Sequence, residues 1–187
     1  MICYRRIQEF GLRSCRPQLV LPLTPEHKSQ RLEWCREPQQ WNDEWKNVVF
    51  SCESRFYLGT HDGCKRVRKR RGERQHMQFA VERHVHCTVG VMVWGAIGYG
   101  SRSSVVFVRD NMTSLRYVDD ILRPSLLPCI QELLEALFQQ DNARPHIARG
   151  TINFFANSHV NLLAWPPRSP DLSPIEHMWD MMGVRIS

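Results

Sequence analysis

The chain has 187 residues, of which 42% are hydrophobic and 24% are charged, as is usual in globular proteins. This length allows one domain of ordinary size plus an appendage. No apolar run approaches the roughly 18 residues that a membrane-spanning helix needs, and residues 1–9 lack the apolar centre of a signal peptide. The seven cysteines form an odd set without a C-x-x-C pair, which argues against a disulfide framework and a standard zinc module.

The positive charge is concentrated in one short stretch. The window 65–74 carries the whole net charge of +6, because basic and acidic residues balance in the rest of the chain. Its basic residues are Lys65, Arg66, Arg68, Lys69, Arg70, Arg71 and Arg74. A run this dense suits binding to a phosphate backbone or a nuclear import signal. The alternative is the solvated tip of a hairpin.

The N-terminal part is expected to be helical. Residues 2–16 resemble the end of a small helical unit that is too short to bury a core alone, and residues 17–22 are expected to form a linker. Thr24 as N-cap, with Pro25 at the first helical position, predicts a helix that ends near Arg36.

The middle of the chain predicts an antiparallel meander of strands joined by short turns. Before the first strand of this meander, Trp41 and Trp45 lie four residues apart and are expected to pack on one face of a helix. The expected strands are Val48–Cys52 continued by Phe56–Leu58, a return through the basic window, 88–97 and Ser104–Val108, with turns at 61–63 and 98–101.

The last third alternates between helices and strands. Thr113 is the expected N-cap of a helix that Pro124 and Pro128 interrupt and that resumes over 129–134. The later expected elements are a strand over 136–140, a helix over 143–157, a strand over 160–165, a proline-rich loop and a helix from about Pro174. The order of the elements predicts an α/β fold in which helices flank a mixed sheet.

Two acidic residues stand where chemistry is expected. Asp141 ends a buried strand at a turn into a helix, which is where α/β sheets place ligand-handling groups. Glu176 lies near the start of the last helix, and two-metal phosphoryl transfer needs carboxylates that converge on a pair of divalent ions. The alternatives are structural: Asp141 and Asp171 as turn residues, and Ser173 with Glu176 as a capping box.

Four segments resemble the catalytic core of Tc/mariner-family transposases, in the order that family has them. They are Phe50-Ser-Cys-Glu-Ser-Arg-Phe56, Val91-Met-Val-Trp-Gly-Ala96, Gln139-Gln-Asp-Asn-Ala-Arg-Pro-His146 and Trp165-Pro-Pro-Arg-Ser-Pro-Asp-Leu-Ser-Pro-Ile-Glu176. The 34 residues between Asp141 and Glu176 match the family's spacing. The resemblance covers about residues 20–187.

The resemblance implies an RNase H-like fold, a nuclear location and DNA as partner, with a homodimer among the expectations. It implies cleavage of DNA at the ends of a mobile element, followed by strand transfer, with Mg²⁺ (or Mn²⁺) as cofactor. Carried over to this sequence, Asp141 and Glu176 are the metal-binding acids. The first catalytic Asp of the family falls at Cys52, so the resemblance assigns three catalytic positions and only two carboxylates.

Cys52 predicts impaired catalysis, because a soft thiolate serves Mg²⁺ poorly and nearby carboxylates keep a thiol protonated. Glu53 is not expected to substitute, since successive side chains on a strand point to opposite faces. The resemblance divides the chain into residues 1–22, a remnant of a helix-turn-helix region with its linker, and residues 23–187, the catalytic domain. Two alternatives remain: a non-catalytic DNA-binding or interaction module that keeps the fold, and an unstable product without function.

Overall fold

The computed structural model describes residues 6–7, 9–11, 13–15, 18–20, 22–57, 67–69, 80–82, 90–131, 133 and 135–186. The chain divides into two compact units, a small one from residues 1–23 and 57–89 and a large one from residues 24–56 and 90–187. None of the helices in the described ranges is long and apolar enough to cross a membrane.

The small unit holds two pairs of short strands. Strand β1 (Arg13–Cys15) pairs antiparallel with β4 (Val67–Lys69), and β2 (Gln18–Val20) pairs parallel with β5 (Ala80–Glu82). The helical unit expected over residues 2–16 is found in part, because residues 6, 7 and 9 are helical and β1 follows them. The predicted linker is wrong where it contains β2, because this segment pairs with a strand far along the chain.

The structure describes only part of the basic window. Arg68 and Lys69 belong to β4, which pairs with β1. The predicted meander required pairing with the strand that begins at Val48. The other five basic residues, Lys65, Arg66, Arg70, Arg71 and Arg74, lie outside the described residues, as does the predicted turn at 61–63.

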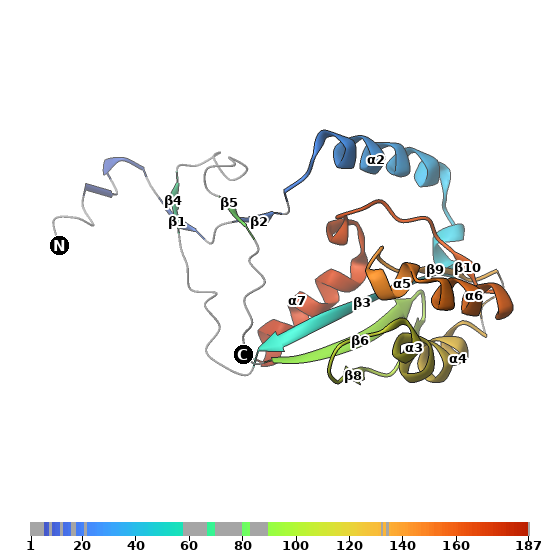
Figure 1. The fold of residues 1–187 in the computed structure, drawn as a ribbon. Coiled ribbons are helices and arrows are strands. Elements are labelled where there is room, and N and C mark those ends of the chain that lie inside the picture. Colours follow the sequence, from blue (N-terminus) through green and yellow to red (C-terminus); the bar gives the residue numbers. More distant parts are fainter. Residues whose placement is uncertain are drawn as a thin grey trace. The chain divides into compact units, whose positions relative to one another are not determined.

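The large unit is built on a six-stranded mixed sheet with the strand order β10-β9-β3-β6-β7, in which β8 also pairs with β6. Its strands are β3 (Val48–Tyr57), β6 (Gly90–Gly98), β7 (Ser101–Arg102), β8 (Val106–Val108), β9 (Leu137–Gln139) and β10 (Asn161–Leu162). β9 runs parallel to both β3 and β10, whereas β7 and β8 run antiparallel to β6. β3 and β6 point in opposite directions (Figure 1). The predicted meander is confirmed for β6, β7 and β8.

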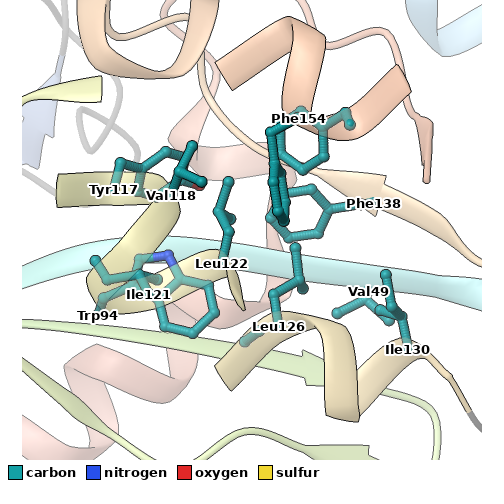
Figure 2. Close-up of a cluster of buried hydrophobic side chains, with 12 residues drawn as sticks. Val49, Trp94, Tyr117, Val118, Ile121, Leu122, Leu126, Ile130, Phe138 and Phe154 are labelled. Atoms are coloured by element: carbon teal, nitrogen blue, oxygen red, sulfur yellow. The ribbon is translucent and has the colours of Figure 1, made fainter. Parts of the chain in front are cut away.

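Helices cover both faces of this sheet. On one face, Val49 of β3 and Phe138 of β9 pack in a core with Tyr117, Leu122 and Phe155 (Figure 2 shows this cluster). On the other face, the alternate residues Val48 and Phe50 pack with Ile175 and Trp179 of the last helix. The alternation along β3 is what a strand buried on both faces requires, and the predicted mixed sheet between helices is confirmed.

The first helix of the large unit begins where the sequence predicts. Helix α2 (Pro25–Arg36) has Thr24 as N-cap, whose hydroxyl accepts from the backbone N–H of His27. The expectation that one helix carries both Trp41 and Trp45 is wrong. Trp41 follows a 3₁₀ helix (Glu37–Gln40) and Trp45 lies in another (Glu44–Asn47). Their rings still pack, with centroids 5.1 Å apart.

The central helix is continuous where an interruption was predicted. Thr113 caps α3 (Ser114–Arg116), which continues as a π-helix over Tyr117–Leu126 and as α4 (Leu127–Ile130). Pro124 lies inside the π-helical part. Proline lacks an N–H and its ring clashes with the carbonyl four residues earlier in an α-helix, so a wider turn accommodates it. The helix ends at Ile130, before the predicted end at 134.

The remaining elements follow the predicted order with shorter bounds. They are β9, α5 (Arg144–Ile147), α6 (Arg149–Asn157), β10, a 3₁₀ turn (Pro170–Leu172) and α7 (Pro174–Ile186). The predicted helix 143–157 is broken at Ala148, whose extended backbone separates α5 from α6. The strand predicted over 160–165 is reduced to the two residues of β10.

Candidate active site around Cys52, Asp141 and Glu176

Neighbouring parallel strands place Cys52 level with Asp141. In the pairing of β3 with β9, Phe50 lies opposite Gln139, so two residues further along the chain Cys52 lies level with Asp141. The hydroxyl of Ser51 donates to the carbonyl oxygen of Gln139 at 2.9 Å and reinforces this register. Asp141 follows the carboxyl end of β9 and its side chain is 57% exposed.

Glu176 reaches the same strand from the start of α7. The Cys52 Sγ lies 3.2 Å from a carboxylate oxygen of Glu176, and the thiol donates to it. The predicted capping box does not form: the N–H of Ser173 donates to the Pro170 carbonyl, and its hydroxyl contacts the Gln139 side chain at 3.5 Å. The carboxylate of Glu176 is therefore directed to β3.

The surroundings of Cys52 keep its thiol neutral. Burial raises the pKa of Cys52, and the negative charges of Glu176, Glu53 and Asp141 raise it further. Since both effects disfavour the charged form, the group between Glu176 and Asp141 is an S–H. This agrees with the expectation from the sequence.

A histidine joins Asp141 to one further acid, Glu53, which lies on the opposite face of β3 from Cys52. Nδ1 of His146 lies 2.6 Å from Oδ1 of Asp141, and Nε2 lies 3.2 Å from Oε1 of Glu53. Burial lowers the pKa of His146, but hydrogen bonds to the two carboxylates outweigh it and raise the pKa to about 9. Partial burial raises the pKa of Asp141, while the hydrogen bond and charge of His146 bring it below its usual value.

Comparison with known proteins places the chain in a family. Residues 47–186 match the model described as DDE superfamily endonuclease. The chain is 35% identical to the Tcb1 transposase of Caenorhabditis briggsae, over 98% of this chain and 70% of that protein. It is 31% identical to the Tc1 transposase of Caenorhabditis elegans, over 97% and 67% of the two chains. The chain belongs to the Tc1/mariner transposases.

Solved structures share the fold of this Tc1/mariner chain. The chain matches the Mos1 strand transfer complex with a TM-score of 0.70 at 16% identity, over 100% of this chain and 56% of that one. It matches the Mos1 catalytic domain with a TM-score of 0.58 at 14% identity, over 90% and 75%. The expected RNase H-like fold is confirmed. The chain thus spans just over half of the Mos1 chain in the complex.

The structure brings the predicted site residues of this Tc1/mariner chain together in two groups. Cys52 pairs with Glu176, and Asp141 pairs with His146. Within the described ranges, no group of three or more His, Cys, Asp or Glu side chains is arranged to hold a metal ion. Asp141 and Glu176 are hard oxygen donors, whereas a protonated thiol is a poor ligand for Mg²⁺. The donors of this chain therefore do not fit a magnesium site.

The sequence reasoning missed His146 and the contact of Glu53. His146 ends the Asp-Asn-Ala-Arg-Pro-His segment and lies on α5, the short helix that turns back over the strand end. A histidine five residues after an acid at such a turn is a usable signal, because one turn of helix returns it toward the acid. The expectation that Glu53 and Cys52 face apart is consistent with their separate partners, His146 and Glu176.

The loop before Glu176 is attached to α2 by an ion pair. Two guanidinium nitrogens of Arg31 donate to the two carboxylate oxygens of Asp171, at 2.8 and 2.6 Å. Next to this pair, the indole N–H of Trp34 donates to the Ala164 carbonyl at 2.6 Å, and the ring of Trp34 packs edge-on against Trp165. Asp171 is thus more than a turn residue, because it fastens the proline-rich loop that leads into α7.

We expect this ion pair to contribute about 1 kcal/mol, the upper end for exposed pairs, because it is bidentate and Arg31 is only 18% exposed. A double-mutant cycle of Arg31→Ala and Asp171→Ala in urea denaturation measures it. The hydrogen bond to Arg31 lowers the pKa of Asp171, so the coupling is present above the ordinary pKa of about 4 and is lost as the pH falls through the lower folded-state value. Coupling that persists at pH 2 would contradict this.

Proposed function

We propose that this chain derives from a transposase that cleaved DNA and joined it to target DNA by metal-dependent chemistry, and that this copy is catalytically impaired. The contact that carries the proposal is the S–H of Cys52 donating to Glu176 at 3.2 Å. It stands where the family resemblance places the first catalytic Asp, beside Asp141 and Glu176. A neutral thiol there removes one hard ligand and one negative charge from the site.

Asp141 and Glu176 are the proposed metal-binding residues of the parent site. When bound, Mg²⁺ or Mn²⁺ would supply Lewis-acid activation and charge neutralisation. Two similar solved structures are described as the Mos1 transposase catalytic domain and raltegravir with Mg or with Mn. In this chain, Cys52 holds its proton toward Glu176 and His146 holds Asp141, so the present donors do not hold the metal in the way the parent site would.

DNA is the proposed partner and the nucleus the proposed location. One similar solved structure is described as a Mos1 paired-end complex with the left transposon end, and a homodimer is part of the same proposal. In this chain, the basic window would contact phosphates without reading sequence, since it is rich in Lys and Arg and carries the chain's net charge of +6. Residues 1–22 as part of a DNA-reading region and residues 23–187 as the catalytic domain belong to the same proposal.

The alternative function is a non-catalytic DNA-binding module that keeps the fold. The neutral Cys52 favours it, because the mutual repulsion of the acids is reduced without any metal. In this case DNA binding, and not cleavage, is the property that the chain retains.

We expect the native chain and Asp141→Ala to nick supercoiled plasmid equally little in Mg²⁺ or Mn²⁺, and to bind DNA equally well in gel shifts. Binding should weaken with salt, and Arg70→Ala/Arg71→Ala should lower the slope of log K against log salt by about two. The matched control is Arg149→Ala/Arg185→Ala, which removes the same charge from two exposed positions of the large unit. Nicking by the native chain well above Asp141→Ala would contradict the impairment, and equal slopes for the two double variants would contradict the role of the window.

A further inference from the structure

His146 has no part in the catalytic set that the family resemblance assigns, yet it lies between two of the site's acids. We propose that His146 is a positioning residue, whose ring ties Asp141 to Glu53 of β3 and fixes which carboxylate oxygen of Asp141 stays open. This inference rests on the proposed metal-binding role of Asp141.

Both ring nitrogens of His146 face carboxylate oxygens, at 2.6 Å from Asp141 and 3.2 Å from Glu53. A neutral imidazole carries one N–H and one lone pair, so one of these contacts would set a lone pair against a carboxylate. Both contacts are hydrogen bonds only when the ring carries a hydrogen on each nitrogen. The ring is then a cation between two anions.

One oxygen of Asp141 is fully engaged by its own chain. Oδ1 accepts from the backbone N–H of Ala143 at 2.8 Å and from His146 at 2.6 Å, which uses both of its lone pairs. Oδ2 has no hydrogen-bond partner in the described part of the chain, and the side chain is 57% exposed. The two bonds to Oδ1 therefore fix the rotamer of Asp141 and leave Oδ2 as the oxygen that an external ligand would meet.

The ring of His146 is itself held from behind. It stacks on the ring of Tyr117, with centroids 4.3 Å apart, and only 4% of its side chain is exposed. The Tyr117 hydroxyl donates to the Gln140 side chain at 3.1 Å, and the amide of Gln140 contacts the His146 carbonyl at 3.4 Å. An imidazolium on an aromatic face is also favourable by itself. Swinging the ring away from Asp141 would break this closed set of contacts.

The clamp that His146 forms on Asp141 and Glu53 lies within the chain and needs no ion. The charge of His146 offsets the two carboxylates that it contacts. The hydrogen bonds to Oδ1 orient Asp141 before any metal is present. Hydrogen bonds that orient a metal ligand in this way are usually worth 10–100-fold in metal affinity. The same arrangement serves this copy structurally, because it joins β3 to the connection between β9 and α5.

The test uses Mn²⁺ alone as probe and the full chain with Cys52→Asp, which restores the third carboxylate. We expect His146→Leu, which removes both donors, to weaken Mn²⁺ binding about 10–100-fold, as measured from free Mn²⁺ by electron paramagnetic resonance. His146→Gln keeps an amide donor of similar reach and should recover part of the loss. His159→Asn is the control, because His159 is exposed and has a positive φ that Asn tolerates.

A second readout needs neither metal nor activity. In the native chain, the hydrogen-bonded ring N–H of His146 should give a low-field proton resonance that disappears in Asp141→Asn and remains in His159→Asn. A resonance unaffected by Asp141→Asn would overturn the clamp. Equal Mn²⁺ affinity of the folded His146→Leu variant would overturn its effect on the site. If Cys52→Asp itself binds no Mn²⁺, the proposed function fails, while the proton resonance still decides the clamp.

Discussion

Cys52→Asp should raise Mg²⁺-dependent nicking of supercoiled plasmid at least about 10²-fold above the native chain. A metal ion stabilises transition-state charge by several kcal/mol, and each 1.4 kcal/mol is a factor of ten in rate. The substitution replaces a partly buried neutral thiol, 3.2 Å from Glu176 and level with Asp141, by a carboxylate. The site then has the three hard ligands that the family resemblance expects.

Two variants make this prediction specific. Cys52→Asn has nearly the shape of Asp without its charge and should stay at the native level. Asp141→Ala placed in the Cys52→Asp chain should remove the gain, because the proposed second acid is then missing. Cooperative thermal unfolding of each variant separates lost chemistry from lost folding. A folded Cys52→Asp chain that nicks no better than Cys52→Asn would show that Cys52 is not what limits this site.

The sequence predicts the elements of the site better than their contacts. Local signals are sufficient where the cause is local: Thr24 and Thr113 are hydroxyl N-caps and the structure has both. The apolar run that ends at Asp141 is likewise found as a strand end. The neutral state of Cys52 also followed from residue chemistry, since burial and nearby acids both raise the pKa of a thiol.

Two failures of sequence reasoning share a physical cause, which is that the partners are distant in the sequence. β1 and β2 were read as helix and linker because their partners lie more than 50 residues away. His146 was passed over because Glu53, 93 residues earlier, supplies its second contact. Pro124 is predicted to break the helix for a local reason: its usual cost assumes α-helical spacing, whereas the wider turn of a π-helix accommodates it at an exposed position.

The packing of α7 on β6 depends on one glycine, Gly95 of β6. A Cβ added at Gly95 would lie 3.0 Å from Cη2 and 3.1 Å from Cζ2 of Trp179. Trp179 is 3% exposed and packs edge-on against Phe56, with centroids 6.0 Å apart. Its ring therefore has little room to move, and it lies three residues after Glu176 on the same helix.

Gly95→Ala should lower the free energy of unfolding by about 1–3 kcal/mol in urea denaturation, as overpacking of a core does. Trp179→Phe removes the two ring atoms that a Cβ would meet. It loses no hydrogen bond within the described part of the chain, where Nε1 of Trp179 has no partner. In the Trp179→Phe background, Gly95→Ala should therefore have little effect, so the two substitutions couple by about 1–2 kcal/mol.

Gly150→Ala is the matched control for this pair. Gly150 lies in α6, and an added Cβ would meet only the Ser114 hydroxyl at an ordinary 3.6 Å. It should therefore leave stability unchanged or raise it by up to about 1 kcal/mol, since alanine is the better helix former. If Gly95→Ala has the same effect with Trp179 and with Phe at position 179, the indole does not rest on β6. The contact of Glu176 with Cys52 would then depend on the loop before α7, where Arg31 holds Asp171.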